Sequence, residues 1–343
     1  MSIDRRTALH DFVAAHLPPG FRIAPASADA SFRSYWRVTA GGSSLILMDA
    51  PPDKEPIAPW LDIAARLRGA GVHAPEVVAS DAAAGFVLME DLGTRTYLPA
   101  LNDASVDALY GAALDALFAM QTRVEAADLP RFDTTRTIPE MELLGDWFLQ
   151  RHLGYTPSCG DWDVIEVAFR LVATALDAQP RRFMHRDYHS RNLMLVDKGD
   201  PAVVAPGLSN PGIIDFQGAM LGPITYDLAS LLRDCYIAWP SARVEAWVEA
   251  YRARLAAAGI IAVDGARFRR WFDLTGVQRH IKVLGLFCRL NYRDRKAGYL
   301  ADLPRVFAYV TDVARQHPEF VDFSTLLQRA VGRRDLTVPA IAP

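Results

Sequence analysis

The chain has little cysteine, no long apolar run and no excess of positive charge. Three of its 343 residues are cysteines, Cys159, Cys235 and Cys288. Their odd number and wide spacing exclude a disulfide framework and a metal-ligand pattern. No apolar stretch approaches the length of a membrane span. The N-terminus begins with charged residues 4–6 and has no long apolar core, so we expect no signal peptide. We therefore expect a cytoplasmic protein with no membrane partner.

The charge balance also limits the class of partner. The chain carries 37 lysines and arginines against 40 acidic residues, a net charge of −3, which argues against general nucleic-acid binding. Hydrophobic residues make up 51% and charged residues 22%, the composition of a folded globular protein. At this length the chain is too long for one small core and suits two lobes.

The order of predicted elements divides the chain near residue 92. Apolar residues at 9–17 fall at helical spacing and predict a helix. Residues 22–50 predict strands with a tight hairpin at Gly41-Gly42. A short helix is expected at 60–67, followed by strands at 75–79 and 85–89. Amphipathic helices then dominate, at residues 106–117, 140–152, 161–178, 223–236, 243–258, 267–290 and 303–315. The prediction is an α+β fold with a small β-rich lobe (1–92) and a larger helical lobe (93–343).

The residues that carry chemistry lie at 185–192 and 213–217. Residues 185–192 follow the pattern H-R-D-x-x-x-x-N, and a second apolar run ends at Asp215. Asp187 would accept the hydrogen bond of an attacking hydroxyl, while Asn192 and Asp215 would supply oxygen ligands to Mg²⁺ bound with ATP. Asp187 alone is equally compatible with a structural loop turn. The three groups together favour a phosphoryl-transfer centre.

These motifs resemble those of a known superfamily. Asp187-x-His189-x-x-Asn192, I-D-F-Q at 214–217 and G-P-x-x-Y-D-L-A at 222–229 are similar to the aminoglycoside phosphotransferase and choline kinase superfamily, over most of the chain. The resemblance implies a bilobal protein-kinase-like fold, with nucleotide bound by the first lobe and catalysis in the second. In such proteins the aspartate that matches Asp227 braces the catalytic loop, and we expect the same here, with structural roles for His185 and His189.

Three further stretches narrow the resemblance. Residues 29–35, 48–52 and 278–285 resemble the cell-wall recycling kinases that phosphorylate N-acetylmuramate and N-acetylglucosamine at the anomeric hydroxyl. This implies an ATP- and Mg²⁺-dependent sugar kinase of peptidoglycan recycling, whose partners are a small sugar and ATP. We expect a monomer. The second enzymatic interpretation is a kinase for another small alcohol, such as choline or homoserine.

The nucleotide side departs from the protein-kinase pattern. No Gly-rich loop occurs in the first lobe, and residues 29–37 take its place by order, which assigns Ser31, Phe32 and Arg33 to the phosphates. An ordinary exposed turn is the alternative for this segment. The resemblance places adenine against the Glu90 carbonyl and the Leu92 N–H.

The strand at 45–49 carries no lysine, and the helix after it has Asp62 as its only acid. The usual phosphate-pairing lysine and its glutamate are therefore missing, and Arg33, Arg37 or Lys54 would have to neutralise the phosphates. The same absence keeps open a nucleotide-binding pseudokinase that regulates a partner.

A late helix carries the predicted substrate-binding residues Arg279, Lys282 and Arg289. Gln278, Lys282 and Arg289 share one helix face, and Arg279 lies nearby. A solvated basic face is the alternative. If the face lines the cleft, it suits a neutral or anionic substrate and opposes a polycationic aminoglycoside. It predicts that N-acetylmuramate is preferred over a neutral amino sugar at low salt.

Overall fold

The computed structural model of the chain describes residues 3–28, 32–196 and 210–339. The chain forms two compact units, the first made of residues 1–125 and 190–219 and the second of residues 126–189 and 220–343. The lobe boundary expected after residue 92 stays a prediction. Among the described residues, no helix is both long and apolar enough to cross a membrane.

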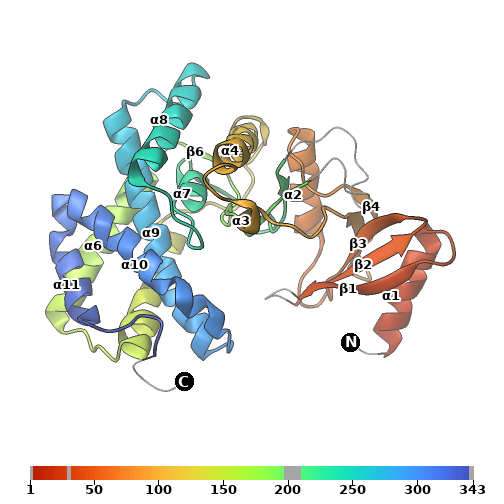
Figure 1. Cartoon of the computed structure of the whole chain (residues 1–343), viewed down its shortest axis with the longest axis horizontal. Coiled ribbons are helices and arrows are strands. Elements are labelled where there is room, and N and C mark those ends of the chain that lie inside the picture. The colour runs from red at the N-terminus through yellow and green to blue at the C-terminus, as the bar shows by residue number, and fades with distance from the viewer. Residues whose placement is uncertain (1–2, 29–31, 197–209, 340–343) are drawn as a thin grey trace. The chain divides into compact units, whose positions relative to one another are not determined.

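The first unit is built on a five-stranded antiparallel sheet with strand order β1-β2-β3-β5-β4 (Figure 1). The strands and helices of this unit are α1 (Ile3–His16), β1 (Arg22–Ala28), β2 (Ser34–Ala40), β3 (Ser43–Asp49), α2 (Ala58–Gly69), β4 (Val77–Asp81), β5 (Phe86–Glu90), α3 (Tyr97–Ala100), α4 (Val106–Arg123), β7 (Leu193–Met194) and β8 (Gly212–Ile213).

The hairpin between β2 and β3 forms where the sequence predicts it. Gly41 and Gly42 have φ values of +58° and +87°, the left-handed conformation that a tight two-residue hairpin requires of both positions. On the sheet, α1 contributes Leu9 and Val13 to a core with Val38, Leu47 and Phe86. The helix predicted from the apolar spacing at 9–17 therefore forms, and its apolar residues pack against the sheet.

The second unit is mostly helical (Figure 1). Its elements are α5 (Thr134–Leu143), the π-helical segment η1 (Leu144–His152), α6 (Cys159–Asp177), β6 (Arg181–Met184), β9 (Met220–Pro223), α7 (Tyr226–Leu232), α8 (Ser241–Ala257), α9 (Gly265–Tyr292), η2 (Ala297–Asp302), α10 (Leu303–Gln316), η3 (Pro318–Phe320) and α11 (Val321–Val331). Strands β6 and β9 pair antiparallel. In sequence they flank the segment that contains Asp187.

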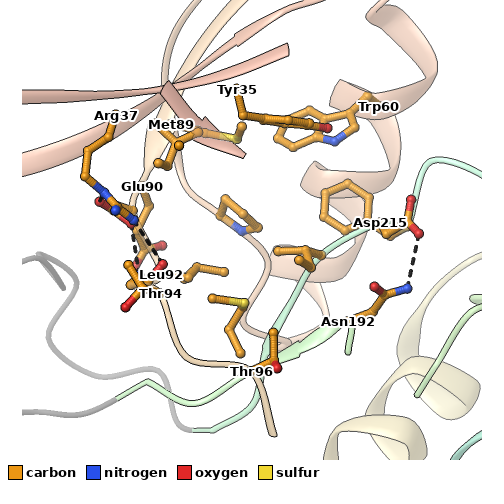
Figure 2. A pocket seen from close by; sticks show the side chains of 18 residues that line it. Tyr35, Arg37, Trp60, Met89, Glu90, Leu92, Thr94, Thr96, Asn192 and Asp215 are labelled. Atoms are coloured by element: carbon orange, nitrogen blue, oxygen red, sulfur yellow. Dashed lines mark hydrogen bonds and ion pairs between the residues drawn. The ribbon is translucent and has the colours of Figure 1, made fainter. Parts of the chain in front are cut away.

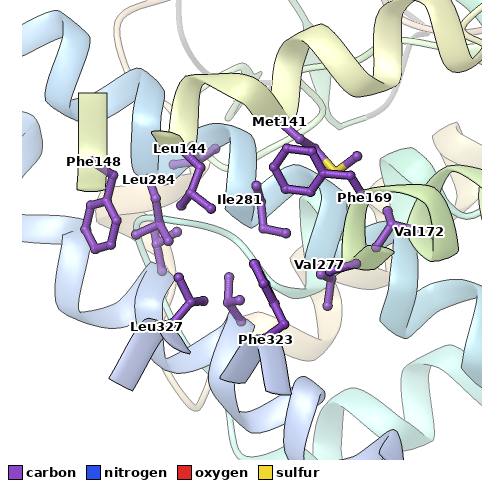
Figure 3. Packing of buried hydrophobic residues seen from close by; sticks show 14 of the residues in the cluster. Met141, Leu144, Phe148, Phe169, Val172, Val277, Ile281, Leu284, Phe323 and Leu327 are labelled. Carbon is purple, nitrogen blue, oxygen red and sulfur yellow. The ribbon is translucent and has the colours of Figure 1, made fainter. Parts of the chain in front are cut away.

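Helix α9 is the centre of this unit. Figure 3 shows Val277, Ile281 and Leu284 of α9 within one apolar cluster. The other labelled members come from α5, η1, α6 and α11, namely Met141, Leu144, Phe148, Phe169, Val172, Phe323 and Leu327. At Gly285 a Cβ atom would lie 2.2 Å from the Leu143 carbonyl oxygen, so only glycine allows α9 to approach the end of α5 this closely.

The α+β prediction is confirmed, with two differences in the helical part. The helix expected at 140–152 is α5 followed by nine residues of π-helix, and α11 lies beyond the last helix that we predicted. Its apolar residues Phe323, Leu326, Leu327 and Ala330 are at helical spacing, so the sequence did contain a signal for it.

Candidate active site

A cavity of about 400 Å³ opens in the first unit. Its lining residues come from the sheet, α2, the segment after β5 and the strands β7 and β8 with their flanks, namely Ala26, Tyr35, Arg37, Ile46, Trp60, Pro75, Met89, Glu90, Asp91, Leu92, Gly93, Thr94, Thr96, Asn192, Met194, Ile214, Asp215 and Phe216. The volume and the mostly apolar walls suit a small organic ligand. In Figure 2, Arg37 and Leu92 lie at one end of this cavity and Asp215 and Asn192 at the other.

The first end is the segment after β5, where we expect adenine. The side chain of Asp91 is fully buried and accepts hydrogen bonds from Arg37 Nε (2.5 Å), Ser44 Oγ (2.7 Å) and the Gly93 N–H (2.9 Å). Glu90 accepts from His73 Nε2 at 3.0 Å and from the Glu76 N–H at 3.1 Å. Both acidic side chains therefore fix the backbone. The Leu92 N–H donates to no acceptor among the described residues and lies in the cavity wall, as an adenine-binding group should.

The second end holds the predicted metal ligands. Asn192 Nδ2 donates to Asp215 Oδ2 at 3.1 Å, and Gln217 Nε2 donates to Asp215 Oδ1 at 2.6 Å. Asp215 has φ +64°, an uncommon conformation for a non-glycine residue, which recurs at functional sites. The two amide donors thus bind one carboxylate oxygen each.

These residues fit a magnesium ion bound together with a nucleotide. Mg²⁺ takes one or two protein oxygens and completes its shell with phosphates and water, so Asp215 and the Asn192 amide oxygen are a sufficient protein contribution. The described residues contain no group of three or more His, Cys, Asp or Glu side chains able to hold a metal by themselves. An ion here would therefore depend on the nucleotide.

The residues predicted to bind phosphate are not gathered at the cavity. Ser31 lies outside the described residues. Phe32 is 68% exposed, and Arg33 Nε pairs with Glu55 Oε2 at 3.0 Å; neither belongs to the cavity wall. Lys54 lies next to Asp53 with an exposed side chain. Of the three candidates for the missing lysine, Arg37 alone lines the cavity, and its guanidinium is bound to Asp91.

The structure also shows which residues occupy the strand that would normally carry the phosphate-pairing lysine. Ile46 is the residue of β3 that lines the cavity. At the end of the strand Asp49 is buried and pairs with Arg5 of α1 at 2.5 Å, which ties α1 to the sheet. On α2, Asp62 pairs with Arg66 one turn later. Asp49 and Asp62 are thus paired with arginines, and neither replaces the glutamate that pairs with the phosphate-binding lysine in kinases.

The second unit holds Asp187 in a cluster of charges. Its side chain is 43% exposed, and Oδ1 lies 3.6 Å from Arg279 Nη1. Partial burial acts to raise the pKa of the Asp187 carboxyl, but the charges of Lys282 and Arg279 outweigh it and hold that pKa well below its ordinary value. The carboxylate is therefore ionised at every pH at which the protein would work, and it is accessible to a hydroxyl.

The backbone before Asp187 is held by Asp227, as the sequence predicts. The Asp227 carboxylate accepts hydrogen bonds from the backbone N–H groups of His185 (2.7 Å) and Arg186 (3.0 Å). Burial raises the pKa of Asp227 to about 7, against the opposing effect of these two donors. His185 and His189 contact aromatic rings, those of Tyr188 and Tyr236, which agrees with structural roles.

Of the predicted substrate residues, two lie at Asp187 and one does not. Arg279 and Lys282 are buried beside it, whereas Arg289 lies two turns further along α9. Burial and the charge of Arg293 lower the pKa of Arg289, with Asp294 opposing them. We did not predict Glu140, which accepts a hydrogen bond from Gln278, a residue that the sequence places on the same helix face as Lys282. Their proximity depends on the packing of α5 against α9, for which the sequence has no local signal.

Comparisons with known proteins agree with this geometry. The model of the phosphotransferase enzyme family matches residues 22–272. The chain belongs to this family. A relative from Pseudomonas aeruginosa, named N-acetylmuramate/N-acetylglucosamine kinase, is 42% identical over 315 residues, covering 91% of this chain and 89% of the relative.

Two solved structures show the same fold at low identity. The choline kinase LicA from Streptococcus pneumoniae has a TM-score of 0.61 at 13% identity, over 91% of this chain and 100% of LicA. An ADP-bound aminoglycoside phosphotransferase, APH(2'')-Ib, has a TM-score of 0.58 at 11% identity, over 91% of this chain and 99% of the other. These structures confirm the protein-kinase-like fold. The family model and the Pseudomonas relative confirm the superfamily predicted from the motifs, so the chain is a nucleotide-using phosphotransferase.

Proposed function

We propose that this protein transfers the γ-phosphoryl group of ATP to the anomeric hydroxyl of N-acetylmuramate or N-acetylglucosamine, giving the sugar 1-phosphate for reuse of cell-wall sugars. The observation that carries the proposal is the ionised, accessible Asp187 carboxylate in a loop braced by Asp227. The name of the Pseudomonas relative supplies the substrate class.

In the proposed reaction Leu92 would bind the adenine, and Asp215 and Asn192 would hold the Mg²⁺ that neutralises the phosphates. Asp187 accepts the hydrogen bond of the sugar hydroxyl and takes its proton. The sugar oxygen forms a bond to the γ-phosphorus as the bond to the ADP oxygen breaks. Asp187 precedes Asn192 by five residues, so the chain limits the separation of their Cα atoms to at most about 18 Å.

The choice of hydroxyl follows from acidity. A carboxylate with a lowered pKa is a weak base, so it orients an alcohol better than it deprotonates one. The anomeric hydroxyl is the most acidic of an amino sugar, because the ring oxygen withdraws charge from C1. Choline and aminoglycosides are cations, which Arg279 and Lys282 beside Asp187 would disfavour.

Phosphorus NMR of the product tests the reaction. With ATP, Mg²⁺ and either amino sugar we expect a sugar 1-phosphate, and Asp187→Asn should lower kcat by roughly 10²–10⁴-fold with little change in the KM for ATP. A 6-phosphate, or turnover of sugars blocked at C1, would exclude the anomeric reaction. If choline or homoserine releases ADP and neither amino sugar does, the protein is instead a kinase for another small alcohol.

A further inference from the structure

Glu140 on α5 joins the catalytic loop to α9. Its Oε1 accepts a hydrogen bond from Arg186 Nη2 at 2.8 Å and lies 3.6 Å from Lys282 Nζ. Its Oε2 accepts from Gln278 Nε2 at 3.2 Å. The Glu140 side chain is 17% exposed, so these contacts are made largely out of water. One carboxylate thus receives donors from two segments that are far apart in sequence.

The first of these segments is the residue directly before Asp187. Arg186 has φ +80°, in the left-handed region that a long side chain rarely adopts. Three contacts hold it there. Its N–H donates to Asp227, its carbonyl accepts from Arg279 Nη1 at 2.7 Å, and its guanidinium is bound by Glu140. A strained residue persists only where its surroundings over-determine it, and the direction of the next side chain depends on that conformation.

The second segment carries the cations that keep Asp187 ionised. Lys282 is buried and has Glu140 as its nearest carboxylate among the ion pairs of the described residues. A buried ammonium needs such a partner to remain charged and in place. Glu140 therefore contacts both groups that support Asp187: Arg186, which precedes it, and Lys282, whose charge lies beside it.

We propose that Glu140 is a positioning residue for phosphoryl transfer: it fixes the direction of Asp187 by holding Arg186 and Lys282. This inference rests on the proposed role of Asp187 as the group that orients the sugar hydroxyl. A displacement of about 1 Å at such a group can cost roughly 100-fold in rate.

The test is Glu140→Gln, which keeps shape and removes the charge. We expect kcat to fall by about 10- to 100-fold while the KM for ATP stays within about twofold, because the nucleotide cavity does not include α5. The matched control is Glu142→Gln, an exposed glutamate on the same helix, which should keep wild-type kinetics. Glu140→Asp keeps the charge but shortens the reach, and we expect an intermediate kcat.

A double-mutant cycle separates positioning from a general loss of fold. If Glu140 acts through Arg186, Glu140→Gln combined with Arg186→Met should lower kcat about as much as the worse single variant. Wild-type kcat in Glu140→Gln, or fully additive losses, would overturn the inference. Should Glu140→Gln not fold, the cycle can be run with Glu140→Asp. If Asp187→Asn is itself fully active, the proposed function fails first; if it is inactive and Glu140→Gln is active, only this inference fails.

Discussion

At the scale of single residues, the predicted metal ligands and the predicted catalytic aspartate are held in place by different kinds of contact. Asp215 accepts hydrogen bonds from the side-chain amides of Asn192 and Gln217. Asp187 is held by its backbone, through Asp227, and by buried cations. A change at Asp215 should therefore affect ligand binding, whereas a change near Asp187 should affect the rate.

The metal end gives the first prediction. Asp215→Ala should remove most of the Mg²⁺-dependent part of the thermal stabilisation by ATP, because the ligand between ion and phosphates is lost. In the wild type that stabilisation is about 2.7 kcal/mol when MgATP is present at 100 times its Kd. A thermal-shift titration measures it, with Asp115→Ala on α4 as the exposed control. Equal shifts in the two variants would show that Asp215 is not a ligand.

His280 gives a pH dependence of stability. It is fully buried, donates from Nε2 to the Arg233 carbonyl at 2.9 Å and stacks on Tyr309. Burial lowers the pKa of His280 to about 3, with the nearby charges of Arg233 and Arg279 acting in the same direction. The unfolded chain takes up the proton near pH 6.5 and the folded protein does not, so stability is lost as pH falls below 6.5.

The neutral variant His280→Gln isolates this contribution. The difference in unfolding free energy between wild type and variant should shrink by about 2 kcal/mol from pH 7.5 to pH 5. Denaturant unfolding at the two pH values measures it. A difference that does not change with pH would mean that His280 is protonated in the folded protein.

At the scale of elements, the sequence predicts best where one segment decides its own structure. The hairpin needs only Gly41 and Gly42, and the catalytic pattern needs only Asp187, Asn192 and Asp215. Both were found. The partners Glu140 and Asp91 were missed because each is defined by a contact across elements. The phosphate-binding assignment for residues 31–33 followed chain order alone, and the structure gives it no support at Phe32 or Arg33.

The approach of α9 to α5 gives a prediction for an element. Gly285→Ala would place a Cβ 2.2 Å from the Leu143 carbonyl oxygen and 2.3 Å from its carbon, so the backbones must move apart. We expect a loss of about 1–3 kcal/mol in stability. Gly111→Ala is the control: it lies within α4 with nothing within 4 Å of the added Cβ, and it should gain up to about 1 kcal/mol. Denaturation midpoints compare the two, and an unchanged midpoint for Gly285→Ala would contradict the close approach.

At the scale of the whole molecule, the charges nearly cancel. The net charge is −3, and the cations nearest Asp187 already have acidic partners. The sequence presents Arg279, Lys282 and Arg289 as a basic face open to an anionic substrate. In the structure Arg279 faces Asp187 and the Arg186 carbonyl, and Lys282 faces Glu140. The attraction available to a substrate carboxylate is accordingly smaller than the sequence suggests.

Salt dependence of substrate choice follows from this pairing. Exposed charges are screened over about 10 Å at 0.1 M salt, whereas buried pairs are screened much less. We expect the ratio of kcat/KM for N-acetylmuramate over N-acetylglucosamine to change by less than about threefold between about 50 and 500 mM KCl, since paired cations attract the lactyl carboxylate weakly. Glu140→Gln leaves Lys282 without its partner, so the ratio should depend more strongly on salt in that variant. A wild-type ratio that falls about tenfold would instead indicate that the lactyl carboxylate binds Lys282 or Arg279 directly.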